Sequence, residues 1–366
     1  MNILRQFFWK VMAPVRWRLE RLEEEQNALR HRQVVLNSSF WDENYYFCQH
    51  NQEIIQSKLY PLDHFMQIGW KQGYNPSEIF DCKAYIERLF NRQQSTPNVN
   101  PLVHFLYWGR FHSVCGYSSN VYPATQETID KYLEQKSGRN SKSVVYTCIT
   151  NDYDDLSAIS SHYYVDPDWD YVCFSDNPQL IAKKQLGIWE IRPLVFDQLD
   201  NTRNNRFHKI LPHRLFPEYD QSVYLDANIN ILSPYLFDEI KKRKDFFLAP
   251  AMLEFTCLYK SAQWMLEEQI DKPLLEKQLA YYRQQGFPEN YGMFENNLLY
   301  RKHNLSVVQN MMEHWWKWVS EYCRRDQASL AYVFWDAHLP IRPFSIHNVW
   351  ADYRNYCIFP HIKPRE

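Results

Sequence analysis

Short apolar runs followed by acidic and amide residues recur in the C-terminal part of the chain and limit its fold more than any other feature. Such runs, rich in β-branched and aromatic residues, are typical of buried strands. Three of them are followed by a polar cluster: 144–149 by Asn151-Asp152-Tyr153-Asp154-Asp155, 171–174 by Ser175-Asp176-Asn177, and 223–225 by Asp226-Ala227-Asn228.

Helical patterns separate these strand-like runs and predict an α/β sheet covered by helices on both faces. Further strands are expected at 189–191, 246–249 and 298–300, and helices at 201–216, from 233, within 261–285, at 304–323 and at 327–335. Ligands of such sheets bind beyond the carboxyl ends of the strands. The polar clusters should therefore meet at one edge and form a binding site.

The cluster at Asp226 carries the most specific chemistry. In an extended segment residues i and i+2 point to the same side, so Asp226 and Asn228 would direct two oxygen atoms to one point. Carboxylate and amide oxygens suit Mg²⁺ or Mn²⁺, which often share their coordination with substrate phosphates. A turn-forming role for Asp226 is the simpler alternative.

The N-terminal third has a different organisation. Residues 1–36 form a charged helical leader, and 37–118 contain a two-copy repeat in which Pro61-Leu62-Asp63-His64-Phe65 is echoed by Pro101-Leu102-Val103-His104-Phe105. We interpret the repeat as a compact helical pair in which both histidines are structural, and as a candidate surface for a protein partner. Residues 119–142 are predicted to be a linker that contains at most one helix, before a domain that spans 143–366.

Composition excludes several classes of function. The 366 residues carry a net charge of −2, which gives no basis for nucleic-acid binding. With 8 glycines, the chain contains neither GxGxxG nor GxxxxGK[ST], so any phosphate must be held without a glycine-rich loop. None of the 8 cysteines forms a CxxC pair, and we expect free thiols in a reducing compartment.

The sequence predicts a cytoplasmic location. No run of eighteen or more apolar residues is present, so no segment is expected to span a membrane. The start of the leader mixes Phe7, Phe8 and Trp9 with Arg5 and Lys10. This segment is either an amphipathic helix on the inner face of a membrane or part of a charged coiled-coil helix. Both interpretations stay open.

One long motif resembles a glycosyltransferase-like domain family shared by bacteria and plants, whose plant members are linked to cell-wall and turgor phenotypes. The motif comprises Asn201-Thr202-Arg203, the stretch from Arg206 to Pro217, Tyr219-Asp220 and Tyr224-Leu225-Asp226-Ala227-Asn228. Matching segments include Glu295-Asn296-Asn297 and Arg325-Asp326-Gln327. The resemblance covers about 143 to the C-terminus, and the repeat resembles short repeats attached to bacterial polysaccharide glycosyltransferases.

This resemblance implies a GT-A-like, Rossmann-like mixed sheet flanked by helices, with a divalent metal, Mn²⁺ or Mg²⁺. Asp226 and Asn228 would hold the metal with His361, while His347 is the runner-up for the histidine and Lys363 would contact a phosphate. Asn in place of the usual second acid removes a negative charge. This substitution leaves open that the reaction depends less on the metal, and that cationic side chains of the protein stabilise the phosphates instead.

The remaining site residues are implied by the same resemblance. Arg203, Arg206 and Lys209 recur every third residue of the predicted 201–216 helix and would stabilise the departing nucleoside diphosphate. We expect the others to have these roles: Asp326, Gln327 and Glu295 in catalysis, Asn296 on the sugar, and Thr147, Asp152 and Asp176 at the nucleoside. Simpler alternatives to these roles are that the three cations form an exposed basic face of the helix, and that Asp326 caps the N-terminus of a helix.

The resemblance implies transfer of a sugar from a nucleotide diphosphate sugar to a polysaccharide or lipid-linked glycan, as in capsule or lipopolysaccharide synthesis in bacteria. Two other classes stay open at this point. One is a metal-dependent hydrolase acting on a phosphate or lipid substrate through the same site. The other is a non-catalytic assembly protein of a polysaccharide-synthesis complex, which Asn228 favours.

Overall fold

The computed structural model describes residues 23, 25–38, 40–93, 98–109, 126–252, 255–344, 349, 352, 355–359 and 361–362. They fall into two compact units, 1–122 and 123–366, which are treated separately. The start of the leader and the candidate phosphate ligand Lys363 lie outside the described residues, as does His347. Within the described part of the chain, no helix has the length and apolar character needed to cross a membrane.

The N-terminal unit repeats one structural device. Its helices are α2 (Glu43–Ser57), α3 (Pro61–Gln67), η1 (Gly69–Gln72), α4 (Cys82–Gln93) and α5 (Pro101–Tyr107). In the first copy the Tyr46 hydroxyl lies 2.8 Å from Nδ1 of His64, and a Cβ on Gly69 would collide with that hydroxyl. In the second copy Tyr85 lies 2.6 Å from Nδ1 of His104. The repeated histidines thus join the helices of each copy.

The second unit contains a seven-stranded mixed sheet in the order β3-β4-β2-β1-β5-β8-β7. The strands are β1 (Ser143–Ile149), β2 (Asp170–Ser175), β3 (Gln185–Leu186), β4 (Trp189–Pro193), β5 (Gln221–Leu225), β7 (Phe247–Leu248) and β8 (Leu298–Arg301). Strands β4, β2, β1 and β5 are parallel, and β8 runs antiparallel to β5 and β7. A separate antiparallel pair joins β6 (Ile229–Ile231) to β9 (Tyr356–Ile358).

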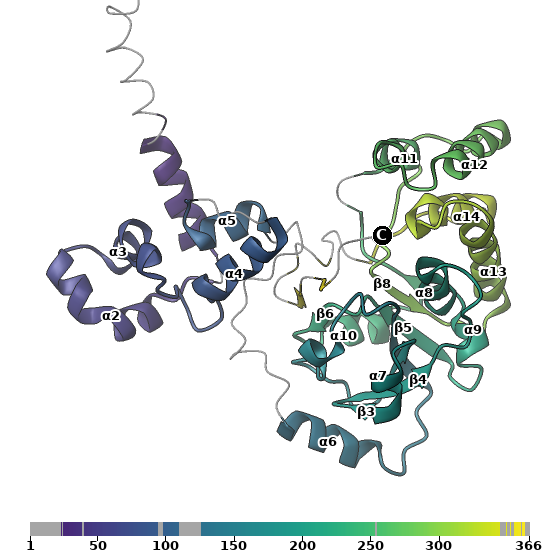
Figure 1. Ribbon diagram of the computed structural model, residues 1–366, viewed down its shortest axis with the longest axis horizontal. Helices are drawn as coiled ribbons and strands as arrows, with labels where there is room; N and C mark the ends of the chain where they lie inside the picture. Colours follow the sequence, from purple (N-terminus) through teal and green to yellow (C-terminus); the bar gives the residue numbers. More distant parts are fainter. Residues whose placement is uncertain are drawn as a thin grey trace, which may run out of the picture. The chain divides into compact units, whose positions relative to one another are not determined.

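Helices cover both faces of the sheet, as predicted. They are η3 (Leu156–Ile159), η4 (Asp326–Ala328) and the α-helices α6 (Gln126–Lys136), α7 (Pro178–Lys183), α8 (Asn201–Ile210), α9 (Pro212–Leu215), α10 (Tyr235–Lys242), α11 (Leu258–Glu267), α12 (Lys272–Gln285), α13 (Ser306–Glu321) and α14 (Leu330–Asp336). Figure 1 shows α13 beside α8. In β1, Val144 and Tyr146 face the core on the side of α8, while Val145 and Ile149 face the opposite core. The α/β class is confirmed, because alternate residues of this strand are buried on both faces.

Two segments differ from the sequence prediction. The expected 201–216 helix stops at Ile210, because Pro212 has no backbone N–H and disfavours helical geometry at Leu211, whose φ and ψ are −110° and 55°. The predicted 119–142 linker contains α6, whose Tyr132 is buried against Trp169 and Tyr171 on one face of the sheet. This helix is therefore part of the second compact unit.

Candidate functional site

A pocket opens at the edge of the sheet where β1 and β5 end. It is lined by residues that follow these two strands, by one face of α8, and by residues that precede β8 and form η4. The polar clusters that follow β1 and β5 meet here because the carboxyl ends of parallel strands lie at the same edge. Of the predicted site residues, the pocket lining includes Arg206, Lys209, Asp226, Asn228, Glu295, Asn296, Asp326, Gln327 and His361.

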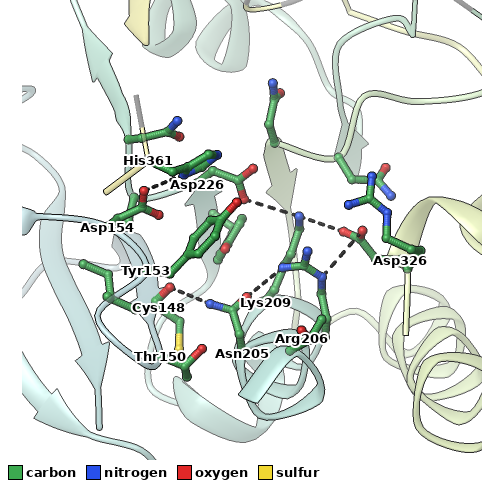
Figure 2. Close-up of a pocket in the computed structure, with 18 of the residues that line it drawn as sticks. Cys148, Thr150, Tyr153, Asp154, Asn205, Arg206, Lys209, Asp226, Asp326 and His361 are labelled. Atoms are coloured by element: carbon green, nitrogen blue, oxygen red, sulfur yellow. Dashed lines mark hydrogen bonds and ion pairs between the residues drawn. The ribbon is translucent and has the colours of Figure 1, made fainter. Parts of the chain in front are cut away.

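The centre of the pocket is a buried charge network (Figure 2). Nζ of Lys209 lies 2.7 Å from Oδ2 of Asp326 and 3.4 Å from Oδ1 of Asp226. Nε of Arg206 lies 3.5 Å from Oδ1 of Asp326. Burial alone would raise the pKa of Asp326, but the charges of Arg206 and Lys209 outweigh it and hold that pKa far below its usual range. Asp326 is therefore ionised and neutralises part of the charge of both cations.

Helix α8 places the two cations. The helix begins at its N-cap, Asp200, whose side chain accepts from the backbone N–H of Arg203. At its other end Arg301 of β8 donates to the carbonyl of Lys209 at 2.8 Å and to the hydroxyl of Tyr146. These contacts fix the backbone of Lys209, whose side chain is only 2% exposed. The ammonium group of Lys209 is therefore held close to Asp226 and Asp326 before a ligand binds.

The structure does not bring Arg203 to the pocket. Its guanidinium donates to the carbonyls of Val319 and Tyr322 and pairs with Asp200 and Asp271. Each three-residue step along a helix falls about 60° short of a full turn. Arg203 is thus rotated away from Arg206 and ties α8 to the segment after α13.

Asp226 and Asn228 lie in a turn between β5 and β6 and not in the extended segment expected from the sequence, because the N–H of Ile229 donates to the carbonyl of Asp226 at 3.1 Å. Asn228 donates from Nδ2 to the carbonyl of Phe359 at 2.8 Å, and the N–H of Phe359 donates to the carbonyl of Asn228 at 2.8 Å. An aspartate at position 228 could not make the first of these bonds. The amide at this position therefore has a structural reason, since it fastens the chain after β9 to the chain after β5.

A second contact orients the histidine. Nδ1 of His361 lies 2.6 Å from Oδ1 of Asp154, and its ring lies 4.3 Å from that of Tyr153. Figure 2 shows Asp154 and His361 beside Asp226. A carboxylate on one ring nitrogen orients the other, as in many metal sites.

These side chains carry donor atoms of the kinds that a divalent cation binds. The Asp226 carboxylate, the Asn228 amide oxygen and Nε2 of His361 are the atoms that remain for it. Among the described residues, no group of three or more His, Cys, Asp and Glu side chains could hold a metal by itself. The remaining ligands would therefore come from a substrate phosphate, as hard cations often require.

Glu295 forms the far side of the charge network. Its Oε1 accepts from Nε2 of Gln327 at 3.1 Å, and Oε1 of Gln327 accepts from Arg325 at 2.9 Å. Burial, together with the negative charge of Asp226, raises the pKa of Glu295 to about 7. The pocket thus holds one carboxyl group that changes its protonation near neutral pH.

Two amides beside Glu295 have no partner. Asn296 and Asn297 are 2% and 4% exposed, and neither the nitrogen nor the oxygen of either side chain makes a hydrogen bond with any described residue. Both line the pocket. Buried polar atoms are nearly always paired in proteins, so these four atoms call for a partner that enters the pocket.

The three residues expected at the nucleoside end are not part of the pocket lining. Thr147 is fully buried in β1, and its hydroxyl is unpaired. Asp176 accepts from the N–H of Asn151, and Asp152 accepts from Nδ2 of Asn177. None of the three predicted residues lines the pocket. The two acids instead shape the loop after β1, which begins with left-handed φ angles at Asn151 and Asp152.

The pocket also contains residues that the sequence analysis did not assign to the site. Asn205 donates to the carbonyl of Cys148 at 2.6 Å and accepts from Arg206, while Asp154 orients His361. Trp264 of α11 lines the opposite end beneath the guanidinium of Arg325. Asp154 and Asn297 adjoin predicted residues and could have been found from the quoted motifs. No sequence signal marks Trp264.

Comparisons with known proteins extend this description. In solved structures the chain is similar to the glycosyltransferase GlyE of Streptococcus pneumoniae in its apo form (TM-score 0.33, 12% identity, 56% of this chain and 46% of that one). It is also similar to mouse xyloside xylosyltransferase 1 (TM-score 0.36, 9% identity, 56% of this chain and 84% of that one). The galactosyltransferase LgtC is a further similar structure (TM-score 0.32, 12% identity, 54% of this chain and 70% of that one). Superpositions this weak transfer neither activity nor substrate to the chain.

A sequence relative and a family model give the stronger result. The chain is 23% identical over 249 residues to a probable hexosyltransferase, MUCI70, of Arabidopsis thaliana, covering 60% of this chain and 42% of the plant protein. It thus spans less than half the length of that relative. The model of the TOD1/MUCI70 glycosyltransferase-like domain matches residues 104–355, more than half of the chain and nearly all of the second unit. The chain therefore belongs to the TOD1/MUCI70 glycosyltransferase-like domain family.

Proposed function

We propose that this protein transfers a hexosyl group from a nucleotide diphosphate sugar to a glycan acceptor. The observation that carries the proposal is the arrangement of Asp226, Lys209, Arg206 and Asp326 at the carboxyl edge of the parallel strands. Such a site combines a candidate metal ligand with fixed cations. Fixed positive charge stabilises the negative charge that develops on a departing nucleoside diphosphate.

The diphosphate is expected beside Asp226. A divalent metal held there by Asp226, Asn228 and His361 would neutralise the phosphate oxygens when bound. The cations Arg206 and Lys209 are already paired with Asp326, and Lys209 also lies close to Asp226. A diphosphate without a metal would therefore add negative charge to a site that has little net positive charge to offer. For this reason we favour a metal-dependent reaction over one that relies on protein cations alone.

The two acids of the network have different proposed roles. Asp326 is held ionised by two cations, so it is a weak proton acceptor and serves to fix Arg206 and Lys209 in place. Glu295, with a pKa of about 7, is matched to accepting a proton from the acceptor hydroxyl near neutral pH. Gln327 orients that carboxyl group through its hydrogen bond. Both inverting and retaining stereochemistry are compatible with these roles.

The acceptor is proposed to be a polysaccharide or a lipid-linked glycan, such as a bacterial capsule or lipopolysaccharide precursor, which would place the reaction in the cytoplasm. The acceptor would enter beside Trp264, which lines the pocket and is partly exposed although Arg325 lies over one face of its ring, because an aromatic side chain packs well against a sugar ring. Contact of the N-terminal leader with a membrane, and of the repeat with a protein partner, stay predictions.

A thermal-shift titration of the full chain tests the donor site. Each nucleoside diphosphate is added with and without Mn²⁺, since a ligand that binds only the folded state raises the unfolding midpoint. We expect a Mn²⁺-dependent rise with one nucleotide, lost in Asp226→Ala and retained in the control Asp220→Ala, whose residue is exposed and outside the pocket. No rise with any nucleotide would contradict the transferase and favour the hydrolase or the non-catalytic assembly protein.

A further inference from the structure

The segment 323–328 brings Asp326 into the pocket although it has little regular structure of its own. It contains one turn, η4, which has no side-chain hydrogen bond at its N-cap. Arg206 and Lys209 both pair with the carboxylate of Asp326. Because these pairs form only when the segment lies at the right distance from α8, contacts from elsewhere in the fold must set its position.

One buried side chain of α12 binds both ends of this segment. Oε1 of Gln278 accepts from the N–H of Cys323 at 3.1 Å, and Nε2 of Gln278 donates to the carbonyl of Ala328 at 3.1 Å. All three residues are fully buried, so water cannot take the place of either bond. A single amide thus spans the segment, and we call this contact the Gln278 clamp.

The chemistry of the amide is matched to this position. The clamp needs one acceptor and one donor side by side, and a glutamine side chain presents both. Its Nε2 also donates to the hydroxyl of Tyr282 at 2.7 Å, and the Tyr282 ring stacks on that of Tyr332 at 4.0 Å between centroids. Packing of α12 alone would be served as well by an apolar side chain of similar volume, without the cost of burying an amide.

A second group of contacts restrains the chain just before the pocket. Oδ2 of Asp271, at the start of α12, accepts from the N–H of Arg324 at 2.8 Å and lies 3.3 Å from the guanidinium of Arg203. Arg203 in turn donates to the carbonyl of Tyr322. Helices α8 and α12 therefore both hold the N-terminal end of the segment. Arg203, which the sequence placed at the phosphates, has its contacts here instead.

The helices that carry these groups also form a wall of the pocket. Figure 1 shows α11 and α12 side by side, and both lie between β7 and β8 along the chain. Trp264 of α11 and Ile270 line the pocket, and the guanidinium of Arg325 lies 5.7 Å from the centroid of the Trp264 ring. The wall where the acceptor is proposed to enter and the segment that carries Asp326 are therefore restrained by the same pair of helices.

We propose that Gln278 is a positioning residue of the transfer reaction. By holding the 323–328 segment it places Asp326 against the cations of α8, and Gln327 against Glu295. This inference rests on the proposed function and adds to it a residue that does not line the pocket. Since Gln278 touches no substrate, its loss should lower turnover more than it weakens nucleotide binding.

Hydrogen–deuterium exchange of the full chain tests the clamp without a substrate. Gln278→Met fills similar space but makes neither bond, and Gln284→Met, at an exposed position of the same helix, is the matched control. We expect the backbone N–H groups of 323–328 to exchange on the order of tenfold or more faster in Gln278→Met, and those of α8 and β8 to exchange as before. Unchanged exchange within 323–328 would overturn the inference. Equally faster exchange throughout the second unit would show a general structural role and overturn it too.

A second variant keeps the test decisive if Gln278→Met does not fold. Asp271→Asn retains an oxygen for the N–H of Arg324 but loses the negative charge that pairs with Arg203. Asparagine tolerates the left-handed backbone at this position, where φ is 43°. Exchange within 323–328 should rise about threefold, because an ion pair gives way to a neutral hydrogen bond. No rise there would overturn the inference.

Turnover distinguishes positioning from stability. Binding of UDP and GDP to the full chain with Mn²⁺ is measured by calorimetry, and release of the tighter binder from UDP-glucose or GDP-mannose is then timed. In Gln278→Met we expect the affinity to stay within about threefold and kcat to fall on the order of tenfold or more. An unchanged kcat would overturn the inference, as would a kcat that falls only in proportion to the affinity.

Failure of the proposed function gives a different result. An unmodified chain that binds neither diphosphate, or releases none, would contradict the transferase. The exchange of 323–328 would then still decide whether Gln278 holds the segment in place.

Discussion

The two sides of the pocket differ in how their buried polar groups are compensated. On the side formed by α8 and η4, Arg206 and Lys209 form ion pairs with Asp326 without a ligand, although Nε of Arg206 and Oδ2 of Asp326 make no hydrogen bond with any described residue. On the side that precedes β8, Asn296 and Asn297 have no partner among the described residues. A paired network supports the fold and presents fixed charge at all times, whereas unpaired amides gain their hydrogen bonds only when a ligand arrives. The first side is thus built for stability and electrostatics, and the second for recognition.

The largest effect is expected when Asp326 is removed from the side of the pocket that α8 and η4 form. Asp326→Ala leaves Arg206 and Lys209 buried without their carboxylate, and loss of one partner of a buried ion pair typically costs about 3–5 kcal/mol. We expect the free energy of unfolding to fall by about this amount in urea titration, and transfer activity to be lost. A decrease below about 1 kcal/mol would show that the network does not support the fold.

The next largest effect is expected at Glu295. If this carboxyl group accepts the proton of the acceptor, kcat/KM should rise as the pH increases through about 7, because the base acts only when deprotonated. Glu295→Gln should lower kcat about 10²–10⁴-fold and remove that rise. An unchanged pH profile in this variant would assign the proton transfer to another group.

A smaller effect is expected at Asn228, which fastens the chain after β9. Asn228→Asp cannot donate to the carbonyl of Phe359 and places two oxygens against each other, so we expect a loss of roughly 1–3 kcal/mol of unfolding free energy in the presence of a chelator. Mn²⁺ should recover part of it by binding the added carboxylate. Asn228→Ala, which loses the bond but adds no charge, should show no such recovery, and equal behaviour of the two variants would rule out metal binding at this position.

The smallest effect on stability is expected at Asn296 and Asn297, on the side of the pocket that precedes β8. Asn296→Ala and Asn297→Ala remove polar atoms that are unpaired in the folded chain, so each should change the free energy of unfolding by no more than about 1 kcal/mol. Urea titration in the absence of nucleotide measures this directly. A loss as large as that of Asp326→Ala would show that the amides have structural partners after all.

Much of the site could be predicted because short-range pattern and strand geometry decide it. Asp226 and Asn228 follow a buried run, and parallel strands end at one edge, so the position of these residues followed from the sequence. Arg206 and Lys209 were placed in the site by the family resemblance, together with their three-residue spacing on one helix. The break before Pro212 was missed, although proline cannot continue the hydrogen bonding of a helix and its position is visible in the sequence.

Other assignments depended on contacts that no local pattern records. Arg203 shares the three-residue spacing of Arg206, yet its partners Val319 and Tyr322 lie more than a hundred residues along the chain. Asp152 and Asp176 hold the loop after β1 through their carboxylates, a role that the sequence did not indicate, and their expected contact with the nucleoside stays a prediction.

Sequence patterns were enough to predict six of the seven strands of the sheet, the edge that carries the polar side chains, and the family that the chain resembles. These properties depend on hydrophobic periodicity and on motifs of adjacent residues. Contacts in the folded protein, by contrast, keep Asp326 ionised between two cations, raise the pKa of Glu295 to about 7, and leave two asparagine amides without partners among the described residues. Those properties depend on burial and on charges from distant segments, because both the strength of an electrostatic interaction and the supply of hydrogen-bond partners are set by what the fold brings together.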